Sequence, residues 1–281
     1  MIPRANITAW RRQAPWSSDA QVEQDLVLSR AIVDIFSEPA LAGALAFRGG
    51  TALHKLYLAP PERYSEDIDL VQTAAGPIGR VMDALRARLD PWLGRPRRGR
   101  AEDSVTLVYR FESETRPVTP LRLKVEVNTR EHFALLGFTK AKLAVENPWF
   151  GGEADVTTYS IEELLGTKLR ALYQRKKGRD LFDLVSALKR VPSLDASKVV
   201  ECFRGYLSRE GLSVSRAEFE ANLAGKAGDP AFTGDVAPLL APSQGQRYDV
   251  HEALEVLRRA VIELLPGEPW KGHRRRPRRR T

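Results

Sequence analysis

The chain has 281 residues, enough for two compact units with hydrophobic cores of their own, and its hydrophobic fraction of 43% is ordinary for a globular protein. No apolar run approaches the roughly 20 residues of a membrane-spanning helix, and the N-terminus has no apolar stretch of the kind found in signal peptides. With one cysteine, Cys202, the chain has no internal disulfide. These features predict no membrane contact and a cytoplasmic location.

The formal net charge of +8 comes mostly from the C-terminus. Residues 271–281 contain one lysine, six arginines and no acidic residue, which leaves 37 basic against 36 acidic residues in the rest of the chain. Such a run is typical of a disordered tail that attracts phosphate backbones non-specifically, or of a terminus that only aids solubility. Two further basic clusters occupy 95–100, where we expect an exposed loop, and 170–179.

The first elements along the chain surround a glycine turn. Apolar spacing predicts a helix over 20–36, a short strand over 44–47 and a helix over 51–58. In the turn, Gly49 and Gly50 let backbone N–H groups approach an anion, because neither residue has a Cβ atom. The helix start adds a positive dipole end, and Thr51 can cap that helix or bond a phosphate oxygen. Alone, such a sequence usually marks only a turn.

Two aspartates follow the turn in a second apolar run. Asp67 and Asp69 are two residues apart, so on a strand they share one face while Ile68 and Leu70 point into the core. Paired carboxylates supply the hard oxygen ligands that Mg²⁺ takes when it also holds substrate phosphates. An Asp-X-Asp alone is typical of a solvated strand. After a glycine turn, it predicts a metal-dependent enzyme that handles a nucleoside triphosphate.

The next elements complete an N-terminal α+β domain. Residues 76–93 have the spacing of a helix, 104–111 that of a strand, and 121–127 alternate strictly between apolar and polar. This order predicts a mixed sheet covered by helices. On the polar face of the last strand, Glu126 either completes a two-metal site with the aspartates or is an exposed residue paired with Lys124.

From residue 156 the pattern predicts a mainly helical C-terminal domain. Ser160 and Glu163 form a capping box before a helix that ends near residue 174. Lys168 lies at the edge of its apolar stripe, where a lysine usually reaches water. Asp180 and Asp183 lie on the next helix, and Asp180 also suits a helix N-terminus. Helices over 196–208, 215–223 and 249–265 and a loop over 225–247 follow. The expected domains are therefore 1–155 and 156–270, with the tail 271–281.

These motifs resemble the nucleotidyltransferase superfamily, and more closely the AbiEii family, the MenT-like toxins of type IV toxin–antitoxin systems. The resemblance spans roughly residues 1–190 and is carried by the N-terminal segment and by four blocks, 47–53, 64–69, 167–172 and 179–184. It implies that Asp67, Asp69 and Glu126 hold two Mg²⁺ ions. The triphosphate would lie against Arg48, Gly49, Gly50 and Thr51. Lys168 would neutralise its charge, and Asp180 or Asp183 would be essential, with the helical half closing over the site.

The resemblance also implies a reaction and its regulation. The enzyme would transfer NMP from an NTP to RNA, the tRNA 3′ end in particular, release pyrophosphate, and so block aminoacylation and translation. A protein or small-molecule hydroxyl is the alternative acceptor, and a non-catalytic nucleic-acid-binding protein is the alternative class. Ser65 is either a simple turn residue or a site of inactivating phosphorylation through a cognate antitoxin. The sequence selects neither the nucleotide nor the RNA.

Overall fold

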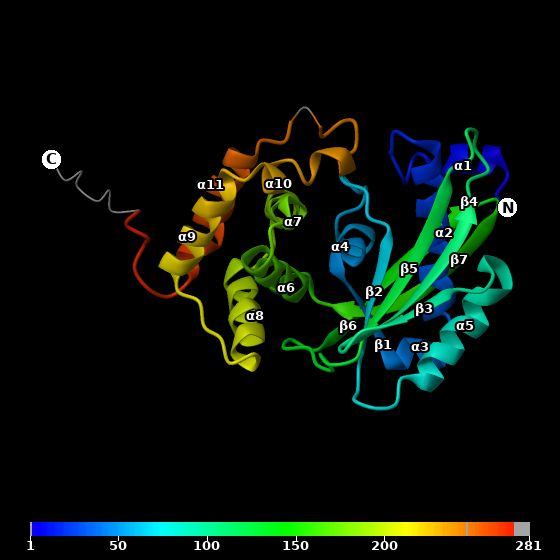
Figure 1. The fold of residues 1–281 in the computed structure, drawn as a ribbon, viewed down its shortest axis with the longest axis horizontal. Helices are drawn as coiled ribbons and strands as arrows, with labels where there is room; N and C mark the ends of the chain where they lie inside the picture. The colour runs from blue at the N-terminus through cyan, green and yellow to red at the C-terminus, as the bar shows by residue number, and fades with distance from the viewer. Residues whose placement is uncertain (1, 246, 273–281) are drawn as a thin grey trace, which may run out of the picture. The chain divides into compact units, whose positions relative to one another are not determined.

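The structure is a computed structural model that describes residues 2–245 and 247–272 (Figure 1). Its contacts divide the chain into two compact units, which are described separately. The first is Met1–Leu164 with Leu239–Arg247, and the second is Leu165–Pro238 with Tyr248–Thr281. The domain boundary predicted at residue 155 falls inside a strand of the first unit and stays a prediction. The arginine run 274–280 lies outside the described residues.

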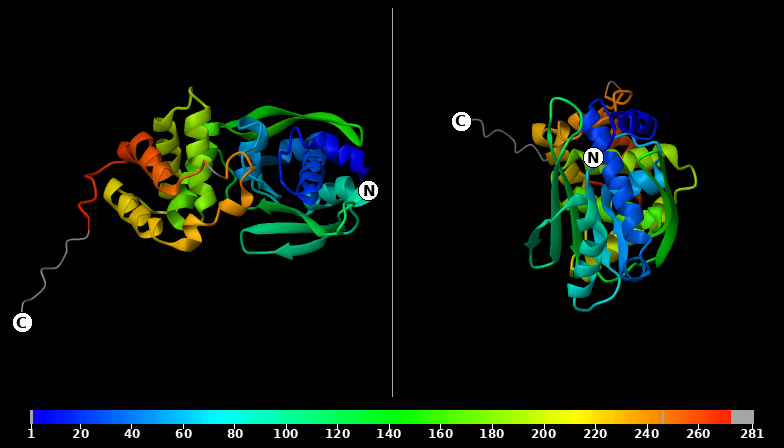
Figure 2. Two further views of the ribbon diagram at one scale, coloured as in Figure 1. Left: turned by 90° about the horizontal axis from the view of Figure 1, so that it is seen from above. Right: turned by 90° about the vertical axis from the view of Figure 1, so that its right-hand side faces the viewer.

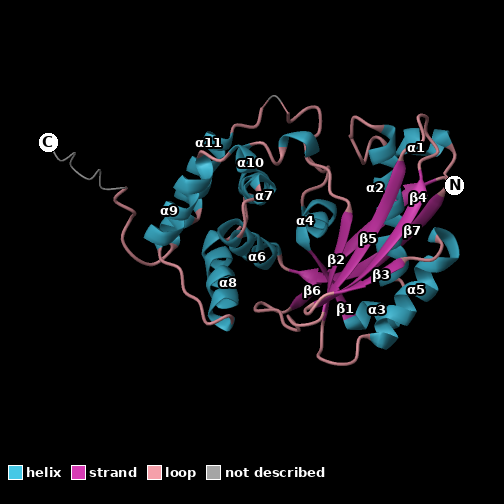
Figure 3. Ribbon diagram, viewed as in Figure 1, coloured by secondary structure: helices cyan, strands magenta, loops and turns pink. Residues whose placement is uncertain are grey.

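A seven-stranded mixed sheet forms the first unit and confirms the predicted α+β class (Figure 3). Its spatial order is β3-β4-β5-β2-β1-β7-β6. The β2–β5 and β1–β7 pairs are parallel, and the other neighbours are antiparallel. The strands are β1 Leu45–Arg48, β2 Asp67–Gln72, β3 Arg97–Arg100, β4 Ser104–Glu112, β5 Pro120–Asn128, β6 Phe138–Asn147 and β7 Phe150–Tyr159.

Helices pack against the sheet and bury the apolar residues of its strands in a shared core. The long helix α2 contacts strands from both halves of the sheet, which lie on either side of it in the right-hand view of Figure 2. The alternating residues Ile68, Leu70, Val125 and Val127 are buried in this core, as predicted. The helices of this unit are α1 Arg4–Trp10, α2 Asp19–Phe36, α3 Pro39–Ala44, α4 Gly49–Ala52 with the π-helical turn η1 Leu53–Tyr57, and α5 Gly79–Leu93.

A buried carboxylate ties the N-terminal segment to the helix after the glycine turn. Asp25 of α2 accepts hydrogen bonds from the indole nitrogens of Trp10, at 2.8 Å, and Trp16, at 3.3 Å. The Lys55 ammonium in η1 lies 2.6 Å from the same carboxylate. Because Asp25 is only 2% exposed, these partners offset the cost of burying its charge. The N-terminal residues that resemble the family thus support the base of the glycine turn.

The basic cluster at 95–100 was wrongly predicted to be a loop. Residues 97–100 form β3, the edge strand, which pairs in antiparallel fashion with β4. All four residues of β3 are exposed. A strand that buries no side chain lacks the apolar alternation by which strands are recognised, and its charges suit an unpaired sheet edge.

A second buried carboxylate in α2 predicts a pH effect on stability. Glu23 is 2% exposed and accepts a hydrogen bond from the Glu114 backbone N–H at 3.0 Å. Burial raises its pKa from 4.5 to about 7. The folded state therefore holds a proton that the unfolded chain releases, and this stabilisation is complete below pH 4.5 and lost as the pH rises through 7.

Glu23→Gln keeps an acceptor for the Glu114 N–H and removes the titrating group. We expect this variant to exceed the parent at pH 8 by up to about 3 kcal/mol in free energy of unfolding, and to differ little at pH 4. Urea unfolding at both pH values measures the difference. An unchanged pH dependence in the variant would show that Glu23 does not titrate in this range.

Residues 156–159, where the helical C-terminal domain was predicted to begin, are the end of strand β7, whereas the described part of the second unit is helical. Its first helix, α6, packs closely against α8: a Cβ atom at Gly166 would lie only 2.5 Å from the Cβ of Cys202. The predicted loop 225–247 contains the end of one helix and two short helical turns. None of the described helices is long and apolar enough to cross a membrane. The elements are α6 Ile161–Gln174, α7 Gly178–Arg190, α8 Ala196–Arg209, α9 Arg216–Ala227, α10 Pro230–Thr233, η2 Ala237–Leu239, α11 Val250–Ala260 and η3 Ile262–Leu264.

Candidate active site

Two neighbouring strands bring the three predicted acids together. In the parallel pairing of β2 with β5, Asp69 lies directly opposite Glu126, and Asp67 lies opposite Lys124. All four side chains are partly exposed on the same face, while the residues between them are buried. Because opposite residues in a ladder share a face, the geometry gathers three carboxylates and one ammonium on a small area of the sheet.

The Asp69 side chain leaves room only for a glycine at the first position of the turn. Gly49 follows β1, whose last residue, Arg48, pairs with Asp69 across the antiparallel ladder. Its φ of +82° lies in the left-handed region, and a Cβ atom built there would lie 2.4 Å from Asp69 Oδ2. Only glycine satisfies both conditions. The turn therefore presents its backbone directly beside the carboxylate.

Gly49→Ala should misplace the Asp69 carboxylate, because the new methyl group and that oxygen cannot occupy the same space. We expect nucleotide transfer to fall by about 10²-fold or more, the usual cost of moving a reacting group by an ångström. Gly43→Ala is the matched control, since a Cβ atom there meets nothing within 4 Å. Comparing initial rates of the two folded variants tests the role of Gly49, and equal rates would contradict it.

Thr51 connects the glycine turn to β2, the strand that carries the two aspartates, by a hydrogen bond. Its buried hydroxyl donates to the Asp67 carbonyl at 2.6 Å and lies 2.8 Å from the Ser65 hydroxyl oxygen. The predicted capping role is wrong, because α4 begins at Gly49 and Thr51 lies inside it. The two hydroxyls instead connect the helix with the residues that enter β2.

The acidic face suits a divalent cation. Asp67 Oδ1 is buried without a hydrogen-bond partner in the described part of the chain. Burial raises the pKa of Asp67 to about 6, with Lys124 lowering it and Asp69 raising it. The Lys124 ammonium lies 2.6 Å from Glu126 and 3.9 Å from Asp67. Although burial opposes its charge, Glu126 and the aspartates raise the pKa of Lys124. A positive charge between these carboxylates is thus favoured.

Among the described residues, no three histidine, cysteine or acidic side chains already converge as a complete metal site. Carboxylate oxygens are the ligands that Mg²⁺ takes when it is held jointly with substrate phosphates, the way this ion is commonly bound in enzymes that use nucleotides. Such an ion would occupy the position towards which the Lys124 ammonium reaches. An ordered ion would also satisfy the buried oxygen of Asp67.

Arg48 has an acidic partner that sequence reasoning missed. Its guanidinium forms an ion pair with Glu131, which lies in the loop after β5. Burial opposes the Arg48 charge, but Glu131 and Asp69 raise its pKa overall. The Glu131 N–H donates to Asn128 at 2.9 Å, which anchors the loop to the strand end. In the sequence, the position of Glu131 just beyond the predicted strand 121–127 was the only indication that it could contribute to the site.

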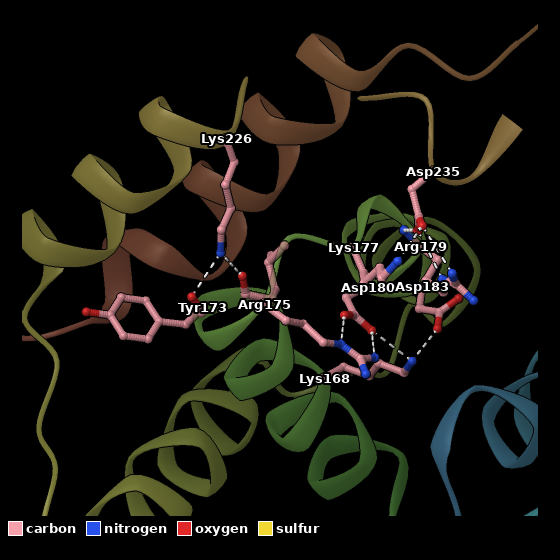
Figure 4. A network of polar contacts seen from close by, with 10 residues as sticks. Lys168, Tyr173, Arg175, Lys177, Arg179, Asp180, Asp183, Lys226 and Asp235 are labelled. Atoms are coloured by element: carbon pink, nitrogen blue, oxygen red, sulfur yellow. Dashed lines mark hydrogen bonds and ion pairs between the residues drawn. The ribbon is translucent and has the colours of Figure 1, made fainter. Parts of the chain in front are cut away.

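The remaining predicted site residues converge within the second unit (Figure 4). Lys168 Nζ lies 3.0 Å from Asp180 and 2.9 Å from Asp183, and Arg175 grips Asp180 through two contacts of 2.7 and 2.9 Å. Both aspartates are fully buried and Lys168 is 7% exposed, so this lysine does not reach water. Despite burial, Lys168 and Arg175 lower the pKa of Asp180. Arg175 is a further residue missed from the sequence.

The basic cluster at 170–179 is neutralised internally. Arg179 makes three contacts of about 3 Å with Asp235, which also pairs with Lys177 at 3.5 Å. The positions of these side chains are visible in Figure 4. The other cations are paired as well: Arg170 with Glu210, Arg175 with Asp180 and Lys176 with Asp229. The charge of this cluster is therefore largely committed to internal carboxylates.

Comparisons with known proteins identify the family and the fold of the chain. A family model described as "Nucleotidyl transferase AbiEii toxin, Type IV TA system" matches residues 30–256. MenT4, a nucleotidyltransferase toxin from Mycobacterium tuberculosis H37Rv, is 16% identical with a TM-score of 0.58, over 94% of this chain and 98% of that one. JHP933 from Helicobacter pylori is 17% identical with a TM-score of 0.51, and the match covers 89% of this chain and 93% of that one. These structures share the fold. No curated protein sequence matches the chain.

Proposed function

Because the chain belongs to the AbiEii family of nucleotidyltransferase toxins of type IV toxin–antitoxin systems, we propose that it transfers NMP from an NTP to an RNA hydroxyl, the 3′ end of tRNA in particular. Such a modification would block aminoacylation and hence translation. The observation that carries the proposal is the shared face of Asp67, Asp69 and Glu126, with Gly49 packed against Asp69. A pure binding protein gains nothing from acids beside an anion site.

In this reaction the role of the protein is to hold the triphosphate and the metal ions in the right positions. Backbone groups of Gly49 and Gly50 would receive the triphosphate, and Asp67, Asp69 and Glu126 would hold two Mg²⁺ ions. When bound, these ions supply phosphate neutralisation and a lowered pKa of the acceptor hydroxyl. The hydroxyl oxygen bonds to the α-phosphorus in line as the bond to the β-phosphate oxygen breaks and pyrophosphate leaves.

Two cationic residues would offset the charge that develops on pyrophosphate. Arg48 lies beside Asp69 in the ladder, and its pairing with Glu131 holds it there. Lys168 is proposed for the same role in the helical unit, where Asp180 and Asp183 orient it.

The direct test is to incubate the protein with each labelled NTP, Mg²⁺ and total RNA. Label in RNA supports the proposal, whereas label in a protein or small molecule supports the alternative acceptors. The absence of transfer with every nucleotide would contradict the enzyme function. A non-catalytic RNA binder would instead bind RNA after Asp67→Ala and lose binding when residues 271–281 are deleted.

Membership in this family implies an antitoxin partner, and we propose Ser65 as the residue through which it acts. The Ser65 hydroxyl lies beside Thr51 and two residues before Asp67. A phosphate there would add nearly two negative charges next to the metal-binding acids and obstruct the NTP. We expect Ser65→Glu to lose most transfer activity and Ser65→Ala to retain it. Full activity of Ser65→Glu in the labelling assay would count against this role.

A further inference from the structure

The sheet continues beyond the three acids as an exposed surface with basic residues. One row of directly opposite residues crosses four strands, from Asp67 on β2 through Lys124 on β5 and Val108 on β4 to Arg97 on β3. Residues in such a row project from the same face. With strands about 4.8 Å apart, Arg97 lies roughly 15 Å from Asp67 on the face that carries the acids.

Two more arginines lie on this face, on the strands between β2 and the edge strand β3. Arg110 on β4 is directly opposite Arg122 on β5, and both side chains are exposed. Like charges in this arrangement destabilise a sheet. Arg122 is partly compensated by Glu66 at 3.5 Å. Arg97 and Arg110 have no ion pair or side-chain hydrogen bond to the described residues.

The residues next to Arg97 on this face have small side chains on β3 and β4. Gly99 on β3 lies opposite Thr106 on β4, which lies opposite Glu126 on β5. Thr106 and Val108 are half-buried, so the surface beside Arg97 is shallow, with Val108 in the row next to Arg110 and Thr106 in the row on the other side. Glu112, at the far end of β4, is the acid on this part of the face. A linear polyanion could lie here without meeting a bulky side chain.

We propose that this surface, formed by Arg97, Arg110 and Arg122 and here called the acceptor track, binds the phosphate backbone of the acceptor RNA near its 3′ end. The inference rests on the proposed function and names the surface that would receive its RNA. The three acids repel an approaching polyanion, and cations beside them offset this repulsion. Guanidinium groups match phosphate oxygens with two parallel hydrogen bonds.

The contrast with the other basic segments supports this assignment. The cations of 170–179 are paired with internal carboxylates, whereas Arg97 and Arg110 stay available to a ligand. β3 also offers a matched control. Its side chains alternate, so Arg98 and Arg100 project from the opposite face, although they are also exposed and carry the same charge.

The test uses two double variants. The track variant combines Arg97→Ala and Arg110→Ala, and the control variant combines Arg98→Ala and Arg100→Ala. Binding of a fluorescent single-stranded RNA oligonucleotide is measured by anisotropy between about 50 and 200 mM salt. We expect the track variant to bind about tenfold more weakly, with a salt dependence shallower by about 1.4 in log–log slope, or 0.7 for each lost phosphate contact. The control should stay within about twofold of the parent.

Kinetics provide the second readout. The track variant should raise the KM for acceptor RNA about tenfold, with the KM for NTP and the kcat at saturating RNA unchanged, because the acids are intact. Equal RNA binding by the two double variants, or no RNA binding by the parent, would overturn the inference. An equal loss of polyglutamate binding would assign the surface to an acidic protein and also overturn it. If the protein binds RNA as expected but transfers no nucleotide, the proposed function is contradicted and the inference about RNA binding is not. The two results are separable because the binding comparison does not depend on catalysis.

Discussion

Asp69→Asn and Asp67→Asn should each reduce nucleotide transfer by at least about 10³-fold. Each change keeps the shape of the side chain but removes the negative charge that would hold the divalent cation, and loss of several kcal/mol of transition-state stabilisation corresponds to such a factor. Asp69 lies opposite Glu126 and against Gly49, so it is at the centre of the proposed site. The measurement is the initial rate of label transfer at saturating NTP and RNA.

The control is Asp83→Asn, which removes the same charge from an exposed position on α5. It should transfer nucleotide at the parental rate. Far-ultraviolet circular dichroism should give the same spectrum for all three variants, because the replaced atoms occupy the same volume. Near-parental activity of either Asp67→Asn or Asp69→Asn would place the metal-binding chemistry elsewhere.

Lys168→Met should destabilise the protein by about 3–5 kcal/mol, because it takes the shared cation away from two fully buried aspartates. Arg175 would still pair with Asp180, whereas Asp183 would lose its ion pair with Lys168. The double variant Lys168→Met with Asp183→Asn should recover part of the stability, since it removes the Asp183 charge too. Urea unfolding followed by circular dichroism measures these differences.

Lys176→Met is the matched control for this prediction. Lys176 also pairs with an aspartate, Asp229 at 3.0 Å, but its side chain is 65% exposed. We expect little or no change in stability, because water screens such a pair. Equal effects of Lys168→Met and Lys176→Met would contradict the buried network. Loss of transfer in a double variant that recovers stability would support a role for the Lys168–Asp183 pair beyond folding.

The sequence predicted those parts of the fold in which local pattern and tertiary environment agree. Strict alternation over 121–127 predicted β5 and its buried face, since one side of that strand packs in the core. The same reasoning placed Asp67 and Asp69 on one face of β2. The hairpin of β6 and β7 was not predicted, because β7 contains glycines and β6 is mostly exposed.

Long-range contacts account for the site details that the sequence could not predict. Arg48 and Glu131 are 83 residues apart, and no local pattern relates them. Thr51 bonds a carbonyl 16 residues away rather than capping its helix. Lys168 is buried because the following helix supplies two aspartates, a contact that its own apolar stripe does not indicate. In each case the partner comes from a different element.

The most direct test of the central claim compares intact RNA with RNA whose terminal cis-diol has been destroyed by periodate. Both are incubated with labelled NTP and Mg²⁺, with the parent protein and with Asp69→Asn. Our account predicts label on intact RNA with the parent protein alone, together with an equal amount of pyrophosphate. Label on periodate-treated RNA, label transferred equally by Asp69→Asn, or no labelled RNA with any of the four nucleotides would contradict it.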